Sequence, residues 1–178
     1  MRVIAGKHRS RILNEFNGQD IRPTTDRVKE SLFNILQNKI QGSTVLDLFC
    51  GSGNLGIEAI SRGAEKVVFI DNSKKSIELC KANLNKLKED GQTLFADSLS
   101  FLKRTIEKFD IIFLDPPYKT DIGENALKII AENQLLTDDG VAVFESDRFL
   151  DKEIGGLTKT DERKYGYVHL SFYKSIKP

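Results

Sequence analysis

Apolar and polar residues follow two periods along this chain, one typical of buried strands and one of amphipathic helices. From residue 44 onward, short apolar runs alternate with longer segments in which apolar residues recur every three or four positions. The runs predict strands at residues 44–49, 66–71, 93–96, 110–115 and 141–145. The segments after the first four runs predict helices. This alternation is typical of an α/β fold, with a mostly parallel sheet covered on both faces.

The end of the chain departs from this pattern. Residues 157–164 and 167–174 flank Tyr165-Gly166 and predict an antiparallel hairpin. Five parallel strands followed by a hairpin differ from the two matched halves of a dinucleotide-binding domain.

The beginning of the chain is a short basic appendage, residues 1–21, ahead of a core that we expect at residues 22–178. Residues 2–6 and 11–13 are expected to pair as strands around a turn. A helix should start after Arg22-Pro23, capped by Thr24 or Thr25. Its expected apolar stripe is Val28, Leu32, Phe33, Ile35 and Leu36.

Length and composition favour one soluble domain. The chain has 178 residues, of which 39% are hydrophobic and 30% charged. No apolar stretch approaches the roughly 20 residues of a membrane span, and the N-terminus lacks the apolar core of a signal peptide. Cys50 and Cys80 make no disulfide framework, and a helical face shared with apolar residues predicts that Cys80 is a buried free thiol. We expect a cytoplasmic monomer.

The net charge of +1 is unevenly distributed. Residues 1–29 hold seven Lys or Arg and three Asp or Glu, a charge of +4, which leaves −3 for the remainder. A basic arm on a mildly acidic body suggests a polyanionic partner gripped at one end. An ordinary solvated basic segment would look the same, because the cations are few.

A glycine-rich loop follows the first strand of the core. Gly51, Gly53 and Gly56 form a G-x-G-x-x-G pattern that lets a ligand approach the backbone. Asp47, four residues before the first glycine, would repel a pyrophosphate but suits a ligand that carries an ammonium and a sulfonium. S-adenosylmethionine fits that description better than NAD. The alternative is that the glycines serve tight packing and the acid caps a turn.

The second and third strands also end in acids. Asp71 lies 20 residues after Gly51, where a carboxylate can accept hydrogen bonds from both ribose hydroxyls of an adenosine. Asp97 can take the adenine amine, with the amide of Ser98 nearby. The same two residues can simply cap the next helix.

Asp115-Pro116-Pro117-Tyr118 carries the reactive chemistry, directly after the apolar run 111–114. The amine of a nucleobase is a poor nucleophile, and acceptors aimed at its two hydrogens favour attack and stabilise the developing charge. Asp115 and the carbonyl of Pro116 are such acceptors, Pro116 and Pro117 hold the loop, and Tyr118 offers a stacking face. The sequence predicts methyl transfer to an amino nitrogen, with no metal required. The alternative is a tight turn with a buried tyrosine.

The chain resembles one family over nearly its whole length, the bacterial RsmD family of 16S ribosomal RNA guanine-N2 methyltransferases. The similar stretches are residues 1–11, residues 22–36 (RPTTDRVKESLFNIL) and residues 47–59 (DLFCGSGNLGIEA). The Asp115–Tyr118 tetrapeptide resembles the Asp/Asn-Pro-Pro-Tyr/Phe motif of the wider class of Rossmann-like methyltransferases that act on amino groups. Two residues depart from the family pattern: Cys50 stands where alanine is common, and Ser10 stands where glycine is frequent.

The resemblance implies a Rossmann-like class I methyltransferase with seven strands in the order 3-2-1-4-5-7-6, strand 7 antiparallel. It implies methylation of a guanine N2 amine in 16S ribosomal RNA, presented on a small subunit or an assembly intermediate. It also implies that the segment around Arg22 and Thr24 closes over the methionine end of the cofactor. The expected cofactor contacts are Thr24, Asp47, Phe49, Gly51, Ser52, Gly53, Gly56, Asp71, Asn72, Asp97 and Ser98. The expected RNA contacts are Arg2, Lys7, Arg9, Arg11, Arg22 and Arg27.

Three other functions remain open at this point. The reactive loop also suits adenine in RNA or DNA and the side-chain amide of a protein glutamine. An NAD-dependent oxidoreductase would share the glycine loop, although Asp47 and the terminal hairpin speak against it. A non-catalytic RNA-binding module would have no need of Asp115 and Tyr118.

Overall fold

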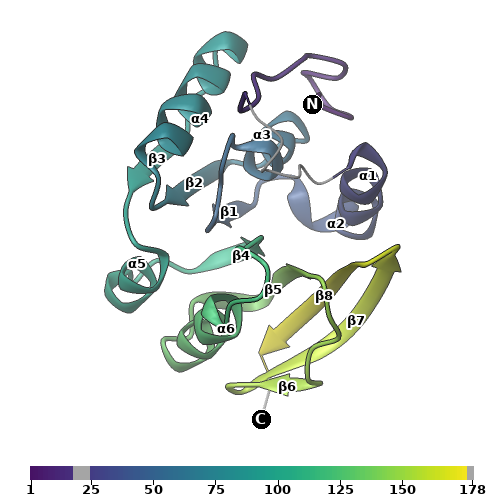
Figure 1. Ribbon diagram of the computed structural model, residues 1–178, viewed down its shortest axis with the longest axis vertical. Helices are drawn as coiled ribbons and strands as arrows, with labels where there is room; N and C mark the ends of the chain where they lie inside the picture. Colours follow the sequence, from purple (N-terminus) through teal and green to yellow (C-terminus); the bar gives the residue numbers. More distant parts are fainter. Residues whose placement is uncertain (18–24, 176–178) are drawn as a thin grey trace.

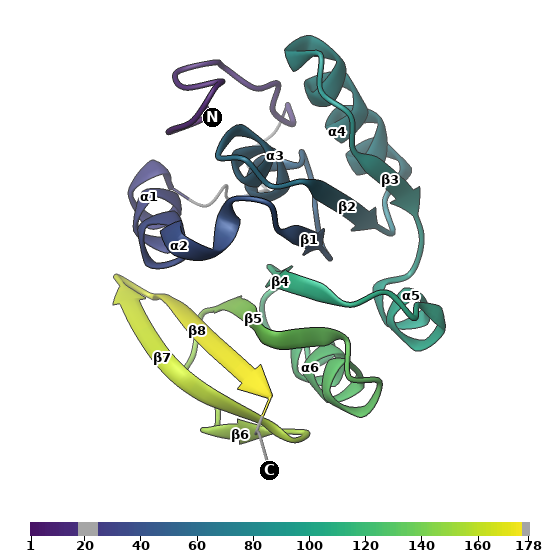
Figure 2. The same ribbon diagram turned by 180° about the vertical axis from the view of Figure 1, so that it is seen from behind.

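The computed structural model describes residues 1–17 and 25–175 and places one mixed sheet between two layers of helices (Figures 1 and 2). The strands are β1 (Thr44–Asp47), β2 (Lys66–Asp71), β3 (Gln92–Phe95), β4 (Phe109–Leu114), β5 (Leu136–Ser146), β6 (Glu153–Ile154), β7 (Leu157–Tyr165) and β8 (Val168–Ser175). The helices are α1 (Asp26–Ile35), α2 (Gln37–Ile40), α3 (Asn54–Ser61), α4 (Lys74–Leu87), α5 (Ser98–Arg104) and α6 (Ile122–Glu132).

The sheet follows the predicted topology with one addition. Its order is β3-β2-β1-β4-β5-β8-β7-β6. β1 to β5 are parallel, and β8 is antiparallel to both β5 and β7. The seven-strand order is therefore confirmed, and the two-residue strand β6 extends it at the edge. β6 was missed because two residues are too short to show a periodic pattern. The hairpin turn lies at Gly166-Tyr167, one residue later than expected.

Side chains alternate across the sheet and build a separate apolar cluster on each face. Val45, Phe113 and Val143 point to the face covered by α1, α2, α3, α4 and the N-terminal segment. Leu46, Ile112 and Phe144 point to the face covered by α5 and α6. Burial on both faces explains why the parallel strands read as continuous apolar runs in the sequence. Cys50 and Cys80 are buried free thiols in the first cluster, as predicted for Cys80.

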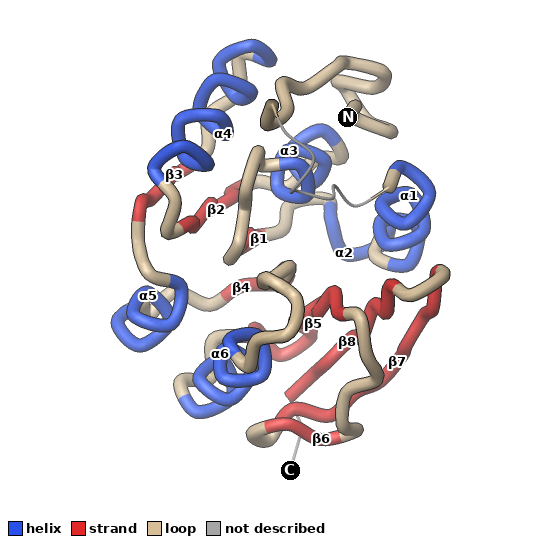
Figure 3. Tube along the Cα trace, viewed as in Figure 1, coloured by secondary structure: helices blue, strands red, loops and turns tan. Residues whose placement is uncertain are grey.

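The N-terminal segment folds back on itself with less strand character than expected. Arg2 and Ile12 form an isolated antiparallel bridge, and the flanking backbone bonds join Val3 to Arg11 and to Ser10. Figure 3 shows this segment as loop. Two strands do not form because the amides of Ile4 and Ala5 donate to Glu58 of α3, at 2.8 and 3.0 Å, instead of to a neighbouring strand.

A buried ion pair anchors this segment to the core. Lys29 of α1 and Glu58 of α3 both have fully buried side chains, with Lys29 Nζ 3.3 Å from Glu58 Oε2. Lys29 also donates to the carbonyl of Arg2 at 2.5 Å, and Arg62 donates to Glu58 Oε1 at 2.8 Å. At the next turn, Gly6 has φ +83°, and a Cβ there would lie 1.9 Å from the carbonyl oxygen of Ser61. The segment is therefore held by its backbone, which leaves its basic side chains on the outside.

α1 begins where the sequence predicted. Thr25 caps it, because its hydroxyl accepts from the amide of Val28 at 3.3 Å. Thr24 and Arg22, which we also singled out, lie outside the described residues.

Candidate active site

The two loops that the sequence singled out leave neighbouring strands at the same edge of the sheet. β1 and β4 are hydrogen-bonded parallel neighbours, with Asp47 opposite Phe113. The chain runs from β1 outward to β2 and β3 and returns to β4, so the direction of winding reverses between β1 and β4. Ligands of open α/β sheets bind at such a switch point, beyond the carboxyl ends of the strands.

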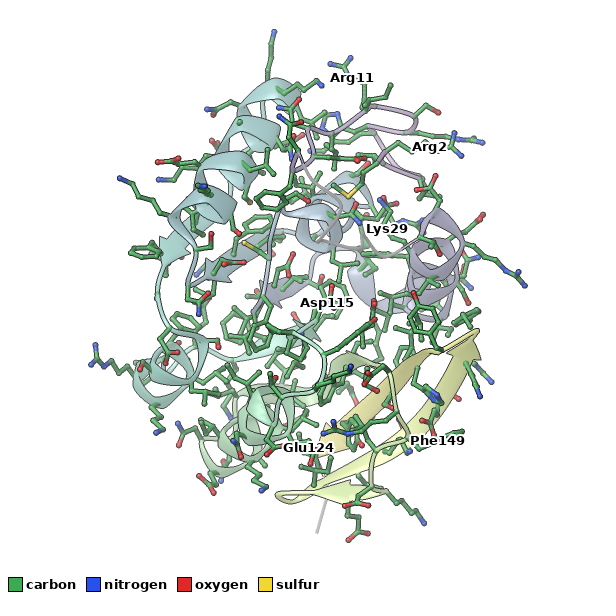
Figure 4. The ribbon with its side chains drawn as sticks, viewed as in Figure 1. Arg2, Arg11, Lys29, Asp115, Glu124 and Phe149 are labelled. Carbon is green, nitrogen blue, oxygen red and sulfur yellow. The ribbon has the colours of Figure 1, made fainter. Side chains whose placement is uncertain are left out.

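A cleft of about 740 Å³ opens there, with Asp115 near the centre of the molecule in Figure 4. Its lining includes most of the predicted residues of both loops, namely Asp47, Phe49, Gly51, Ser52, Asp71, Asn72, Ser98, Asp115, Pro116, Pro117 and Tyr118. Met1, Glu15 and Phe16 of the N-terminal segment also line it. The expected meeting of the glycine turn and the double-proline turn is thus confirmed.

The three glycines of the first loop divide into two kinds. Gly51 has φ +54° and lines the cleft, and nothing would lie within 4 Å of a Cβ on it. A Cβ on Gly53 would lie 2.7 Å from Cys80 Sγ, and one on Gly56 would lie 2.2 Å from the ring of Phe69. Gly53 and Gly56 therefore allow α3 to pack closely on α4 and β2, as the packing alternative stated, and Gly51 alone of the three faces the ligand space.

Asp71 ties the glycine loop to β2. Its Oδ2 accepts from the amide of Gly51 at 2.9 Å, and its Oδ1 accepts from the amide of Ser73 at 2.8 Å. A carboxylate has about four acceptor positions, so these two bonds leave room for hydroxyl donors from the cleft.

Asp97 acts as the cap that the alternative described. It is exposed, and its carboxylate accepts from the amide of Ser100 at 2.8 Å at the start of α5. The hydrogen bonds from Ser100 hold the pKa of Asp97 below its usual range. Ser98 lines the cleft and Asp97 is absent from that lining. The structure thus brings Ser98 to the site and leaves Asp97 outside its wall.

Asp47 is a buried carboxylate at the end of β1. It is 2% exposed, and its Oδ2 accepts from the amide of Gly56 at 2.9 Å. Burial, with a smaller contribution from the charge of Asp71, raises its pKa to about 7, against the lowering effect of that hydrogen bond. A cation beside Asp47 would restore the charged form.

The pKa of Asp115 is raised as well. Burial is the main cause that raises its pKa well above the usual range, and the charges of Glu145 and Asp47 add to it. Tyr118 donates its hydroxyl to Glu145 Oε1 at 3.0 Å, which fixes the ring beside Asp115. Thr120 donates to the carbonyl of Pro117 at 2.8 Å and holds the turn. The loop therefore presents an acceptor and an aromatic face from one rigid stretch of backbone.

Glu145 was not identified as a site residue from the sequence, where it closed the predicted strand 141–145. It is 7% exposed at the end of β5 and lines a second cavity of about 330 Å³ that adjoins the cleft at Tyr118. The signal was present: Asp47, Asp115 and Glu145 each follow an apolar strand run, and the carboxyl ends of parallel strands share one edge of the sheet.

Comparisons with known proteins identify the family. The family model described as "Conserved hypothetical protein 95" matches residues 1–174. The Haemophilus influenzae protein named ribosomal RNA small subunit methyltransferase D is 38% identical, over 98% of this chain and 94% of its own. The Escherichia coli K12 protein of the same name is 34% identical, over 83% of this chain and 75% of its own. The chain belongs to this family. The RsmD resemblance is thereby confirmed.

Solved structures place the fold of this family member among the methyltransferases. An Escherichia coli structure, provisionally named a methyltransferase, has a TM-score of 0.87 at 31% identity. The match covers 97% of this chain and 96% of the Escherichia coli chain. The Thermus thermophilus 16S rRNA N2 G1207 methyltransferase, solved with AdoMet and guanosine, has a TM-score of 0.69 at 24% identity, over 86% of this chain and 44% of its own. The second likeness establishes the fold. The class I methyltransferase fold is confirmed, and none of these proteins is named an oxidoreductase.

The predicted RNA contacts lie in two places on this family member. Arg2, Lys7, Arg9 and Arg11 lie on the N-terminal segment, and Figure 4 shows Arg2 and Arg11 pointing outward from it, away from Asp115. Arg2 pairs with Asp26 at 2.9 Å and Lys7 with Glu89 at 2.7 Å. Arg27 lines the second cavity. Arg22 lies outside the described residues.

Two kinds of feature are absent from the described residues. Residues 1–17 and 25–175 contain no group of three or more His, Cys, Asp or Glu arranged to hold a metal ion. None of the helices in those residues has the length and hydropathy of a membrane span.

Proposed function

We propose that this enzyme transfers a methyl group from S-adenosylmethionine to the exocyclic N2 amine of one guanine in 16S ribosomal RNA. The observation that carries the proposal is the cleft between β1 and β4, in which the Gly51 turn meets Asp115-Pro116-Pro117-Tyr118. The names of the family's relatives indicate that the substrate is ribosomal RNA, and the chemistry of the tetrapeptide indicates that the methyl acceptor is an amine.

The cleft fits the cofactor through side chains that differ in charge and shape. Asp47 carries a buried carboxylate whose pKa of about 7 would fall beside an ammonium or sulfonium. Asp71 retains acceptor positions for the ribose hydroxyls, and Phe49, Asn72 and Ser98 line the space left for the adenosine. Gly51 gives the ligand access to the backbone. We further propose that Thr24 closes over the methionine end.

The reaction depends on groups that act on the amine. The bound cofactor supplies an electrophilic methyl group on a sulfonium. Asp115 and the carbonyl of Pro116 accept hydrogen bonds from the two N–H groups of the amine. These bonds direct the nitrogen lone pair out of the plane of the base. The raised pKa of Asp115 also makes its carboxylate a good acceptor for the proton that the methylated amine releases. The ring of Tyr118 stacks on the base and keeps it in line.

We propose that residues 1–21 serve as the RNA-gripping arm of one catalytic unit spanning residues 1–178. The arm is anchored through its backbone, so its arginines are presented outward to phosphates. We expect the substrate to be a small ribosomal subunit or an assembly intermediate in the cytoplasm, and the enzyme to act as a monomer.

The direct test is transfer of labelled methyl from S-adenosylmethionine to small ribosomal subunits that lack the modification, followed by nucleoside analysis. The proposal requires N2-methylguanosine in 16S ribosomal RNA. Methylated adenosine, or label in protein, would replace it with one of the alternative amine substrates. A parallel titration with S-adenosylhomocysteine and with NAD tests the cofactor, and tight NAD binding would overturn it.

A further inference from the structure

Glu145 occupies a position on β5 that corresponds to Asp115 on β4. Leu114 and Phe144 are register partners in the two parallel strands, so Asp115 and Glu145 are the next residues on adjacent strand ends. Glu145 is 7% exposed, and its charge is the largest electrostatic contribution to the raised pKa of Asp115. Two carboxylates thus lie side by side where the amine is held.

Tyr118 connects Glu145 to the reactive loop. The tyrosine hydroxyl donates to Glu145 Oε1 at 3.0 Å, and both residues line the cavity of about 330 Å³ next to the cleft. That volume lies in the range of small-ligand pockets, about 300–1,000 Å³. Asp115 lines the cleft, Glu145 lines the second cavity and Tyr118 lines both, so a base stacked on Tyr118 would lie near both carboxylates.

The other walls of this cavity suit a nucleotide. Arg27 from α1 and Lys164 from β7 contribute cationic side chains, and Tyr165 contributes a second aromatic ring. Tyr165 is fixed by a hydrogen bond between its hydroxyl and that of Ser31. Cations that meet phosphates and rings that meet bases are the usual elements of a single-stranded nucleic-acid site.

The bases that carry an exocyclic amine differ in the hydrogen-bonding group beside that amine, and a carboxylate can distinguish a donor from an acceptor there. The one ring nitrogen next to the exocyclic amine of adenine or of cytosine carries a lone pair. Guanine has N1–H on one side of its amine and the lone-pair nitrogen N3 on the other, and only N1–H can donate to a carboxylate. A carboxylate next to the amine-binding acceptors accepts a hydrogen bond from guanine and repels the other two bases. A flipped-out base is read through this edge.

We propose that Glu145 reads this edge and so makes the enzyme specific for guanine. The inference rests on the proposed function, because it requires that the bound amine is the N2 amine of guanine. In this arrangement Glu145 accepts from N1–H, while Asp115 and the Pro116 carbonyl accept from the amine. A carboxylate has about four acceptor positions, so the bond from Tyr118 and the bond from N1–H are compatible.

The test uses two substrates that differ only at this edge. The wild-type reaction on unmodified subunits first maps the target guanine, which is then replaced by 2-aminopurine in an RNA assembled into the same particle. 2-Aminopurine keeps the 2-amine but has a lone pair at N1. Both particles are assayed with wild-type enzyme, with Glu145→Gln, and with Glu153→Gln as a matched control on the exposed edge strand β6.

The wild-type enzyme and Glu153→Gln should prefer guanine over 2-aminopurine by roughly 100-fold or more in kcat/KM, as expected for a site that pairs with an N–H. Glu145→Gln should bring this ratio below about 10, because its amide donates to a lone pair where the carboxylate repels it. Any intrinsic difference between the two amines is the same for every enzyme, so the change in ratio reports on Glu145. Equal affinity for S-adenosylhomocysteine in all three enzymes shows that each is folded.

Two results would overturn the inference alone. An unchanged preference in Glu145→Gln would remove Glu145 from the base edge. An equal loss on both substrates, with cofactor binding intact, would reduce Glu145 to a residue that positions Tyr118. A wild-type enzyme that yields no N2-methylguanosine would instead overturn the proposed function itself, and that outcome is visible before any variant is made.

Discussion

Two regions of this molecule bury carboxylates, and the groups that surround the carboxylates are opposite in charge. Beneath the N-terminal segment, Glu58 has no exposed side chain and is fully paired. Its carboxylate forms ion pairs with Lys29 and Arg62 and accepts hydrogen bonds from the amides of Ile4 and Ala5. Every charge and donor there is satisfied, although burial still lowers the pKa of Lys29.

In the cleft, Asp115 has acidic groups as its charged neighbours. The charges that shift its pKa belong to Glu145 and Asp47, and all of them raise it. Such an arrangement costs stability in the empty protein and is favourable once a cation and hydrogen donors arrive. The Glu58 cluster therefore holds structure together, whereas the Asp115 cluster is prepared for a ligand.

The largest effect is expected for Asp115→Ala, which removes the carboxylate of the cleft. We expect methyl transfer to fall at least about 1,000-fold, or roughly 4 kcal/mol, because an acceptor for the amine is lost in a water-poor site. The free energy of unfolding should stay the same or rise, because an unfavourable charge is removed. Initial rates with labelled cofactor and urea unfolding measure the two quantities, and cofactor affinity serves as the control for folding. Turnover equal to wild type would refute the role of Asp115 as an acceptor.

Glu58→Gln tests the other region, and here we expect the free energy of unfolding to fall. Removing one partner leaves Lys29 buried without its counter-ion, so the free energy of unfolding should fall by about 3–5 kcal/mol. The matched control is Glu78→Gln, where the lost partner is an exposed pair with Lys74 at 4.0 Å, and the cost should stay under about 1 kcal/mol. Equal costs in the two variants would show that the anchor contributes no more than a surface pair.

The sequence predicted the elements whose signal is local. The alternation of strands and helices, a threonine cap of α1 and the acids after β1 and β4 all follow from short patterns of apolar, capping and acidic residues. The order of the strands in the sheet came instead from the resemblance to the family. The carboxyl ends of neighbouring parallel strands must share an edge, so the meeting of the two loops could be inferred before any coordinates.

The Glu58 anchor could not be predicted in the same way, because its partners come from three separate segments. A hint exists in the sequence: Ile57, Ala59 and Ile60 surround Glu58, and a helix that is apolar on all sides is buried. A buried acid needs partners, but nothing local names Lys29. Tight packing of Gly53 and Gly56 was one of the two roles open from the sequence, but their neighbours could not be named, since Cys80 and Phe69, which an added Cβ would meet, belong to other elements.

A third prediction sharpens the comparison through pH. Folding raises the pKa of Asp47 from 3.8 to about 7, so the folded protein holds this proton more tightly than the unfolded chain. The contribution of Asp47 to stability therefore decreases as pH rises through that window. A cationic cofactor requires the ionised form, so its affinity should rise up to tenfold per pH unit below about 7 and level off above it.

Calorimetric titration with S-adenosylmethionine from acid to neutral pH tests this dependence. Asp47→Asn should bind more weakly and lose the slope, because its side chain keeps an acceptor for the Gly56 amide but does not titrate. The same slope in Asp47→Asn and wild type would assign the titration to another group.

The smallest expected effect concerns the arm that the Glu58 anchor holds in place. Replacing Lys7, Arg9 and Arg11 by glutamine should lower the dependence of RNA affinity on salt by about 2 in log–log slope, with a modest loss of affinity. Lys7 should contribute least, because it already pairs with Glu89 at 2.7 Å. The matched control neutralises three exposed cations on and after α5, Lys103, Arg104 and Lys108, and should leave the slope unchanged. Because the arm is fixed through its backbone, these substitutions test phosphate contact and not folding, and an unchanged slope in the arm variant would remove the arm from the RNA interface.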